Sequence, residues 1–213
     1  MIATDNGPLS AEQKRVFVIE DDAAARSAVC EMLEPKGLKV EAYGSAEEFL
    51  ANRKPEGPSC LLLDDRLPGM RGSELLRRLA EDGVQTPAVL ITGYATTSTT
   101  VDAMRHGAVS VLDKPCSDIA LEEAVGAAIA ADVLRREQEQ PSRVAKERLS
   151  KLNDSEMEVL RMVLDGVPNK QIASRMGVCI RTVESRRSKI YSAAQVNSVA
   201  ELVRLCVAAG VVD

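Results

Sequence analysis

The stretch that decides the fold is "LLLDDRLPGM", residues 61–70, in which three leucines lead directly into two aspartates. A short apolar run bounded by turn residues such as Pro68 and Gly69 is typical of a strand buried on both faces of a sheet. Successive side chains of a strand point to opposite faces. We therefore expect Asp64 and Asp65 to point in opposite directions and to serve different purposes.

Strands and helices alternate on both sides of this stretch. Short β-branched or apolar runs predict strands at 15–19, 38–43, 59–64, 86–92 and 108–113. Amphipathic or capped segments predict helices at 23–37, 46–53, 72–82, 96–107 and 117–140. Such alternation predicts an α/β fold, with a five-stranded parallel sheet, helices on both of its faces and right-handed crossovers.

The last third of the chain has a different pattern. Residues 135–151 are charged and contain Pro141, which indicates a linker of mixed helix and coil. The remainder carries no strand pattern and predicts helices at 155–166, 168–177, 180–194 and 198–210. The second and third of these helices are separated by a few residues that include Gly177, which is the arrangement of a helix–turn–helix unit.

The distribution of charge also divides the chain in two. Residues 1–142 carry a net charge of −9 and residues 143–213 carry +4, which together give the formal net charge of −5. The acidic first part and the basic second part of the chain predict two modules with different partners. The partner of the basic module is expected to be a polyanion. Chance asymmetry is the alternative that charge by itself leaves open.

Other classes of protein are disfavoured by composition. The five cysteines are scattered and lack C-x-x-C spacing, so neither a disulfide framework nor a zinc site is indicated. The stretch "MIATDNGPLSAEQKR" has no apolar core of the kind a signal peptide needs, and no uncharged apolar run is long enough for a membrane helix. We expect a soluble, cytoplasmic protein that does not bind a membrane.

Polar side chains collect where the expected parallel strands end, which is where such sheets bind ligands. The residues that arrive there are Glu20, Asp21, Asp22, Asp64, Asp65, Thr92, Asp113 and Lys114. Closely spaced carboxylates repel one another unless a cation lies between them, and Mg²⁺ is the natural one. A lysine and a hydroxyl would complete a site that accepts a phosphoryl group on a carboxylate. Taken singly, an aspartate at a strand end is more often a turn or cap residue.

In this respect the chain resembles the receiver domains of two-component response regulators, which have a flavodoxin-like fold. The matching segments are "IEDD" (19–22), "LLLDDRLPGMRG" (61–72), "ITGYA" (91–95) and "DKP" (113–115). The resemblance implies that Asp64 is the phosphoacceptor, because the family's proline lies four positions later, as Pro68 does. It implies a magnesium site made by Asp21 directly, Glu20 through water, Asp64, and the backbone carbonyl of Arg66.

The resemblance further implies that Thr92 and Lys114 contact the phosphoryl group and that a histidine kinase partner supplies it. The chain's only histidine, His106, is interpreted as an ordinary surface residue, so the chain is not itself that kinase. We expect the receiver to span residues 14–135, a linker 136–147, and a DNA-binding domain 148–213.

Two departures from the family pattern leave alternatives open. Val111 stands where members usually carry an aromatic residue, and Cys116 where many carry phenylalanine. A receiver-like module that ignores phosphate and binds DNA constitutively is therefore a second hypothesis. A phosphatase or phosphotransferase on a similar sheet is a third, but it usually needs an acid two residues after its nucleophile, where this chain has Arg66. We expect that the protein is not an enzyme.

Cationic and polar residues share a face of the helix expected at 180–194. The wider pattern, with "NKQIA" (169–173), "MGV" (176–178) and "RTVE" (181–184), is similar to the LuxR-type helix–turn–helix domain. With the receiver, it resembles the FixJ/NarL class of transcriptional regulators. The resemblance implies base contacts by Glu184, Ser185 and Ser188, and phosphate contacts mostly by Lys170, Thr182, Arg186 and Lys189 on double-stranded DNA. The alternative is that this face of the helix is only solvated and does not contact DNA.

Glu184 departs from the family, which usually has lysine at that position. A glutamate can accept a hydrogen bond from cytosine N4, so we expect a distinct preference in DNA sequence. The final helix carries Val199, Leu202, Val203 and Cys206 along one stripe and resembles the family's dimerisation helix. We therefore expect a homodimer that forms when the protein is phosphorylated or bound to DNA. Such a dimer would bind inverted-repeat DNA sequences.

Overall fold

The structure is a computed structural model that describes residues 13–53 and 57–212. It divides into two compact units, Met1–Arg136 and Glu137–Asp213. The expectation that the N-terminus is no signal peptide concerns residues 1–12, which lie outside the described residues. Among the helices of the described part, none has both the length and the apolar character needed to cross a membrane.

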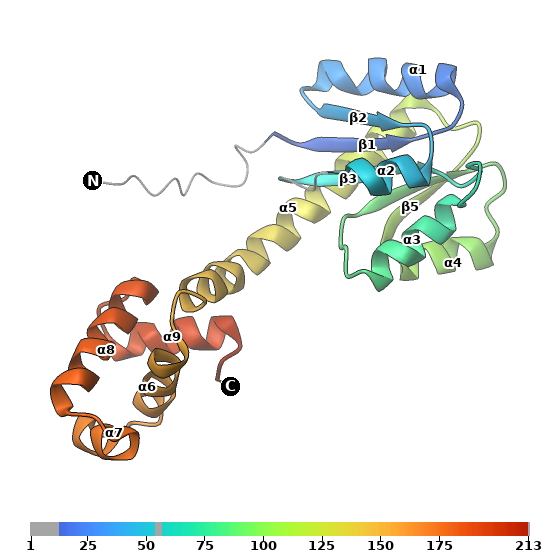
Figure 1. Cartoon of the computed structure of the whole chain (residues 1–213). Helices are drawn as coiled ribbons and strands as arrows, with labels where there is room; N and C mark the ends of the chain where they lie inside the picture. Colours follow the sequence, from blue (N-terminus) through green and yellow to red (C-terminus); the bar gives the residue numbers. More distant parts are fainter. Residues whose placement is uncertain (1–12, 54–56, 213) are drawn as a thin grey trace. The chain divides into compact units, whose positions relative to one another are not determined.

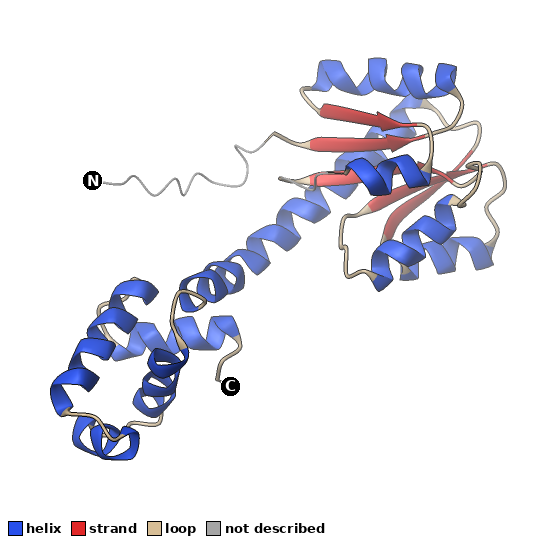
Figure 2. Ribbon diagram, viewed as in Figure 1, coloured by secondary structure: helices blue, strands red, loops and turns tan. Residues whose placement is uncertain are grey.

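The first unit is a parallel sheet covered by helices on both faces (Figure 1, Figure 2). Its strands are β1 (Arg15–Ile19), β2 (Lys39–Tyr43), β3 (Ser59–Asp64), β4 (Ala88–Thr92) and β5 (Ala108–Asp113). Its helices are α1 (Ala23–Leu33), the 3₁₀ turn η2 (Glu34–Lys36), α2 (Ala46–Asn52), α3 (Gly72–Glu81), α4 (Thr97–Arg105) and α5 (Asp118–Leu149). The strand order is β2-β1-β3-β4-β5, and every pairing is parallel. The predicted flavodoxin-like α/β fold is confirmed.

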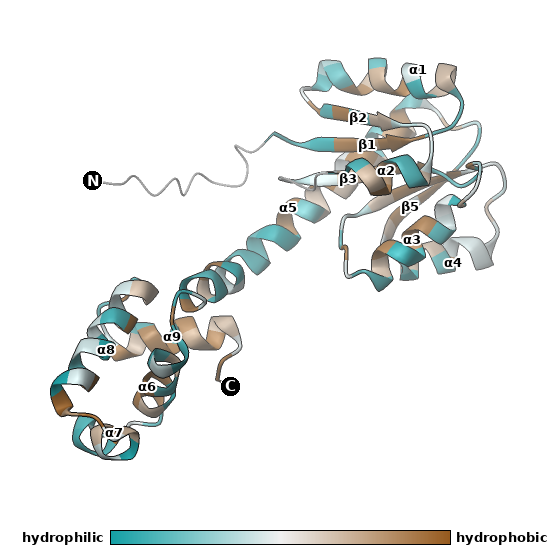
Figure 3. Cartoon of the chain, viewed as in Figure 1, coloured by the Kyte–Doolittle hydropathy of each residue, from teal (hydrophilic) through white to brown (hydrophobic). Residues whose placement is uncertain are grey.

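The alternation of side chains along the central strands produces two separate cores. In β3, Leu61 and Leu63 belong to the cluster that packs against α2, α3 and α4, whereas Cys60 and Leu62 belong to the cluster that packs against α1 and α5. All six residues of β3 are buried, as expected of a central parallel strand. The hydropathy colouring shows the same apolar strands inside the unit (Figure 3).

Scarce aromatic residues are concentrated in one of these cores. Phe17, Tyr43 and Phe49 form a mutual set with ring centroids 5.5–6.5 Å apart. Each is buried, and together they join β1, β2 and α2. The two pairs that involve Phe49 are edge-to-face, a geometry that adds about 0.5–1.5 kcal/mol per pair beyond burial. The remaining core is aliphatic, as the composition requires.

Residues 135–151, expected to be a linker of mixed helix and coil, are helical as far as Leu149, so the expectation of coil was wrong except at the last two residues, which form a turn. Helix α5 runs without a break from Asp118 to Leu149 and contains Pro141. Proline in a helix interior costs roughly 3 kcal/mol. Here it is flanked by strong helix formers, and Ala145 and Leu149 are buried in the core of the second unit. Packing of those last turns stabilises helix on the far side of the proline.

The second unit is all-α, as predicted. It contains the end of α5 followed by α6 (Asp154–Leu164), α7 (Asn169–Met176), α8 (Ile180–Ala194) and α9 (Val199–Ala209). Helix α7 ends at Gly177, whose φ of 65° is the left-handed conformation that glycine adopts without strain. The turn that follows leads directly into α8. The described residues thus form the predicted helix–turn–helix arrangement.

Candidate functional site

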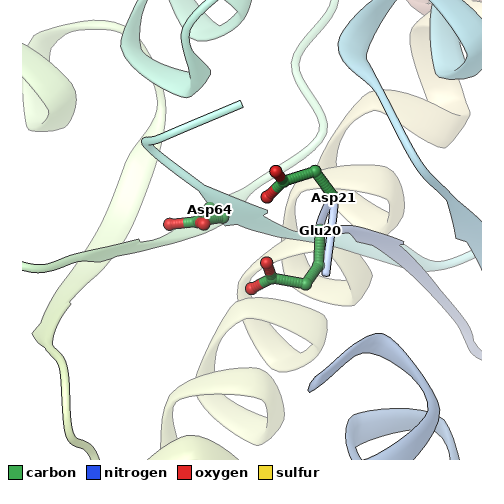
Figure 4. A group of neighbouring side chains, drawn as sticks. All are labelled: Glu20, Asp21 and Asp64. Atoms are coloured by element: carbon green, nitrogen blue, oxygen red, sulfur yellow. The ribbon is translucent and has the colours of Figure 1, made fainter. Parts of the chain in front are cut away.

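Three carboxylates meet at the carboxyl end of the sheet (Figure 4). Ile19 of β1 lies opposite Leu63 of β3, so Glu20 and Asp64 emerge side by side from adjacent strands. One oxygen from each of Glu20, Asp21 and Asp64 lies within 4.8 Å of the others. Such a cluster of hard oxygen donors is one that a divalent cation can occupy.

Lys114 provides the positive charge in this group. Its Nζ lies 2.9 Å from Glu20 Oε2 and 3.0 Å from Asp64 Oδ2. Burial, above all, raises the pKa of Glu20; the hydrogen bond from Lys114 offsets part of that rise, and the charge of Asp64 adds to it. Burial acts to lower the pKa of Lys114, but the contacts with Glu20 and Asp64 outweigh burial and raise it. The lysine therefore stays charged between two carboxylates.

The remaining residues predicted for this site lie on the neighbouring loops. Thr92 ends β4 and is buried, and its hydroxyl accepts a hydrogen bond from the N–H of Tyr94 at 3.3 Å. Arg66 donates its backbone N–H to Asp64 Oδ1 at 3.3 Å. Its guanidinium lies against Gly93, where an added Cβ would come within 3.1 Å of Nη2. Arg66 thus borders the carboxylate cluster from the loop after β3, and Thr92 lies at the end of the adjacent strand β4.

The two adjacent aspartates have different surroundings. Asp64 is buried and faces the cluster, whereas Asp65 accepts a hydrogen bond from the N–H of Ser73 at 3.1 Å, in the first turn of α3. Asp65 is half-buried and anchors the start of α3 through this hydrogen bond. Gly72 is required beside them, because a Cβ there would lie 2.4 Å from the carbonyl oxygen of Asp64.

Two residues at the start of α1 have roles that the sequence interpretation missed. Asp22 caps α1, since its Oδ1 accepts from the N–H of Ala25 at 2.8 Å, and it takes no part in the carboxylate cluster. Arg26 reaches back from α1, and its Nη1 donates to the carbonyls of Glu20 at 2.6 Å and Asp21 at 3.2 Å. The signal available in the sequence was that Arg26 lies four residues after the cap residue Asp22, which places it one turn into the helix.

Helix α8 presents a shallow hollow of about 390 Å³. It is lined by Cys179, Arg181, Thr182, Ser185, Arg186 and Lys189. Four of these were predicted to contact DNA, and Cys179 and Arg181 are additions that adjacency to Thr182 could have indicated. Glu184 and Ser188 are exposed elsewhere on the same helix, and Lys170 is exposed on α7.

Helix α8 is fixed to its neighbours by polar contacts on its flanks. Arg187 donates to Asn169 Oδ1 at 2.7 Å, which joins α8 to the start of α7. Lys189 lies 3.8 Å from Glu156 of α6, and its side chain is 68% exposed. The ammonium of Lys189 thus remains accessible to an anion while its stem lies near α6.

Cys179 differs chemically from the buried cysteines. Its Sγ lies 3.2 Å from the hydroxyl of Thr182, and this hydrogen bond, first among several, lowers the pKa of the thiol. Burial raises the pKa of the Cys60 thiol to about 12. Since the thiolate is the reactive form, Cys179 is the more nucleophilic.

We expect iodoacetamide to alkylate Cys179 well before Cys60 or Cys206, and bound DNA to slow that reaction severalfold. The reason is that Cys179 lines the hollow on α8, whereas the other two are buried. Peptide mass spectrometry after timed quenching, with and without duplex DNA, measures both rates. Equal labelling of Cys179 in the two samples would show that DNA does not cover this end of α8.

The expected stripe on the final helix divides into two faces. Leu202 and Cys206 are fully buried in the core of their own unit, so the expectation that they share an outer face was wrong. Val199, Val203 and Val207 are 37–48% exposed and follow one another at i, i+4 and i+8. The unpartnered apolar stripe of α9 consists of these three valines.

The two positions that depart from the family pattern are packed residues. Val111 is partly buried against the core that includes α3 and α4. Cys116 is partly buried against the core that includes α5. His106 ends α4, with Nδ1 at 2.8 Å from the carbonyl of Asp102. None of the three belongs to the carboxylate cluster among the described residues.

Comparison with known proteins agrees with this division. Residues 16–126 match the family model "Response regulator receiver domain", and residues 150–206 match "Bacterial regulatory proteins, luxR family". Nodulation protein W of Bradyrhizobium diazoefficiens is 37% identical over 92% of this chain and 86% of its own length. The transcriptional regulatory protein FixJ of Azorhizobium caulinodans is 35% identical over 94% of this chain and 95% of its own.

The solved structure of the response regulator StyR has a TM-score of 0.76 and 35% identity, covering 91% of this chain and 98% of that one. Fold and site together define a receiver joined to a DNA-binding unit. The chain belongs to the FixJ/NarL class of response regulators. A protein of this kind serves a two-component system as a transcription regulator; its receiver implies a histidine kinase partner and its LuxR-type domain implies DNA.

Proposed function

We propose that Asp64 accepts a phosphoryl group from a histidine kinase and that this controls DNA binding by the second unit. The observation that carries the proposal is the convergence of Glu20, Asp21 and Asp64 with Lys114 at 2.9–3.0 Å from two of them. A structural ion pair would need one carboxylate per cation. Three carboxylates around one lysine leave negative charge that a further cation would neutralise.

We infer that this cation is Mg²⁺. Asp21 and Asp64 would bind it directly, Glu20 through water, and the carbonyl of Arg66 would add a further oxygen. The fit rests on donor chemistry, since Mg²⁺ favours carboxylate, carbonyl and water oxygens and retains several waters. When bound, the ion would neutralise charge that develops on the phosphoryl oxygens.

In the transfer step, a carboxylate oxygen of Asp64 attacks phosphorus while the bond to the kinase's histidine nitrogen breaks, and the imidazole leaves with its electron pair. Lys114 would hold one phosphoryl oxygen by charge and Thr92 another by its hydroxyl. Lys114 already lies against Asp64, and Thr92 ends the adjacent strand.

For DNA, we propose that α8 enters the major groove, as the second helix of this motif does. Glu184, Ser185 and Ser188 would face bases, and phosphate contacts would come from Lys170, Thr182, Arg186 and Lys189. The cationic hollow on α8 supports this assignment. Phosphate contacts position the protein, whereas base contacts specify the sequence. A regulator of chromosomal genes would act in the cytoplasm.

We propose the domain boundaries as 14–135 for the receiver, 136–147 for the linker and 148–213 for the DNA-binding domain. The division after Arg136 supports the first of these. Residues 136–147 are helical, as part of α5. Ala145 and Leu149 are both buried in the core of the second unit, so this core includes a residue of the proposed linker as well as residues from 148 onward.

The test uses duplex DNA that the full chain itself selects from a random library. Beryllofluoride with Mg²⁺ mimics the phosphorylated aspartate, so we expect it to tighten binding to the selected duplex by about tenfold, which is 1.4 kcal/mol. Equal binding with and without the adduct would favour the alternative, a receiver that ignores phosphate and leaves DNA binding constitutive. Val111 and Cys116 in place of aromatic residues are the features that favour this alternative.

Substituting Glu184→Lys is expected to change the preferred DNA sequence. A glutamate accepts from cytosine N4 whereas a lysine donates to guanine, and each good base contact discriminates by about 1–3 kcal/mol. Library selection with wild type and variant measures the preference. Lys170→Ala is the control, expected to weaken binding to all sequences alike. An unchanged preference in Glu184→Lys would remove this residue from base recognition.

Introducing charge in the valine stripe is expected to weaken a homodimer on DNA. We propose that Val199, Val203 and Val207 pack against the same residues of a second copy, since an isologous interface pairs one patch with itself. Val203→Glu should lower the affinity of the second copy for an inverted repeat at least tenfold in gel-shift titrations. Ala200→Glu introduces the same charge at an exposed position of α9 outside the stripe and should have a much smaller effect. Equal effects would exclude the stripe as the interface.

A further inference from the structure

Arg26 is attached to the backbone of the acidic turn rather than to its carboxylates. Its Nη1 donates to the carbonyl oxygen of Glu20 at 2.6 Å and to that of Asp21 at 3.2 Å. In the described part of the chain, Arg26 takes part in no salt bridge within 4 Å that would explain its placement otherwise. One nitrogen therefore holds two successive carbonyls of the turn that carries two members of the carboxylate cluster.

The same turn is held at two further points. The N–H of Glu20 donates to the carbonyl of Tyr43 at 3.2 Å, and the N–H of Asp22 donates to Glu20 Oε1 at 3.3 Å. These bonds fix the amides of the turn, and Arg26 fixes its carbonyls. Asp22 caps the helix that bears Arg26, so the guanidinium starts from a defined helical position.

We propose that Arg26 is a positioning residue for the metal site, one that presets the directions of Glu20 and Asp21 toward Asp64. This inference rests on the proposed Mg²⁺ site. Without Arg26, the backbone carbonyls of Glu20 and Asp21 would turn toward water. Mutual repulsion would then move the carboxylates of the two residues apart. A ligand set preset by outer partners binds metal more tightly, and loss of one such partner typically costs about 10–100-fold in affinity.

The sign of the effect separates this role from simple electrostatics. A guanidinium that acted only as a nearby positive charge would repel Mg²⁺, so removing it would tighten binding. A guanidinium that sets the direction of the ligands would have the opposite effect. The hydrogen bonds to carbonyls, rather than to carboxylates, favour the second role, because Arg26 leaves the carboxylate oxygens unengaged.

The experiment measures Mg²⁺ affinity of the full chain by calorimetry for wild type, Arg26→Ala, Arg26→Lys and Arg77→Ala. Arg77 is exposed on α3 and serves as the matched loss of one cation. We expect Arg26→Ala to bind Mg²⁺ at least tenfold more weakly and Arg77→Ala to match wild type. Arg26→Lys should recover part of the loss, because one nitrogen makes both bonds. Circular dichroism confirms the folded state of each variant.

A second measurement separates positioning from damage to the fold. The rate at which acetyl phosphate phosphorylates Arg26→Ala should approach the wild-type rate at saturating Mg²⁺, with only the half-saturating concentration raised. Unchanged or tighter Mg²⁺ binding by Arg26→Ala would overturn the inference while leaving the site in place. Absence of Mg²⁺ binding in wild type would instead contradict the proposed function, so the two failures are distinguishable.

Discussion

An Asp64→Asn variant is expected to accept no phosphoryl group, with labelling from a small phosphodonor and Mg²⁺ reduced to background. The amide nitrogen and oxygen of asparagine do not attack phosphorus as a carboxylate does. The substitution also removes one of the three charges of the cluster, so Mg²⁺ should bind more weakly. Intact-protein mass spectrometry after incubation with acetyl phosphate measures the labelling directly.

Asp65→Asn provides the matched control. It removes the adjacent charge, yet its amide oxygen can still accept from the N–H of Ser73, where Asp65 Oδ1 accepts at 3.1 Å. This variant should therefore be labelled as wild type is, and its DNA binding should still respond to beryllofluoride. Labelling that survives in Asp64→Asn and is lost in Asp65→Asn would reverse the assignment of the two aspartates.

The largest effect on stability is expected at Asp132 in α5. Its carboxylate is fully buried, accepts from the N–H of Ser59 at 2.9 Å, and is paired with Arg135 and with Arg136 Nε at 2.7 Å. These contacts join α5 to the first residue of β3. Removing one member of a buried ion network leaves the others uncompensated and typically costs about 3–5 kcal/mol.

We expect Asp132→Ala to destabilise the receiver unit by about 3 kcal/mol, near the lower end of that range, because water can reach the two arginines. Their side chains are 28% and 17% exposed. The stability of Asp132→Asn should lie between those of wild type and Asp132→Ala, since the asparagine keeps an acceptor for the N–H of Ser59 but loses the charge. Glu123→Ala, an exposed site on the same helix, is the control.

Urea titration of the full chain, followed by hydrogen exchange in peptides from β1 and β3, assigns the loss to the receiver unit. The peptides of α8 should keep their protection at urea concentrations where those of β3 have lost it. A loss below about 1 kcal/mol would mean that the network contributes no more than an exposed ion pair. Such a result would remove Asp132 as the anchor of α5.

Much of the fold could be predicted because local signals agree with one another. Strand β3 begins and ends at the predicted residues, since an uninterrupted apolar run suits only a strand buried on both faces. Ser and Asn are residue types that favour helix starts, and Ser45 and Asn153 cap α2 and α6 in the structure. The prediction failed at Pro141, where a local helix-breaking signal is overridden by the burial of Ala145 and Leu149.

The candidate site was also accessible to sequence reasoning in its outline. Residues that follow parallel strands must meet at one edge, so the approach of Glu20 to Asp64 could be expected before any coordinates. Contacts that depend on where a long side chain turns could not. The sequence does not distinguish an Arg26 that faces solvent from one that reaches the carbonyls of Glu20 and Asp21, and this reach follows from the packing of α1 beside the turn.

By itself, the sequence determined the class of fold, the order of its elements, and the carboxylates and basic helix on which function depends, because periodicity and spacing are local properties. Only the tertiary structure decided which of two equally apolar residues becomes core. Leu202 and Val203 are neighbours on α9, yet one is fully buried and the other is exposed. For Asp64 and Asp65, the alternation of a strand already predicted opposite directions, and the tertiary structure decided their partners, which are Lys114 for the first and the N–H of Ser73 for the second. Hydrophobicity ranks residues for burial, but the neighbours that a face meets in space determine which are buried.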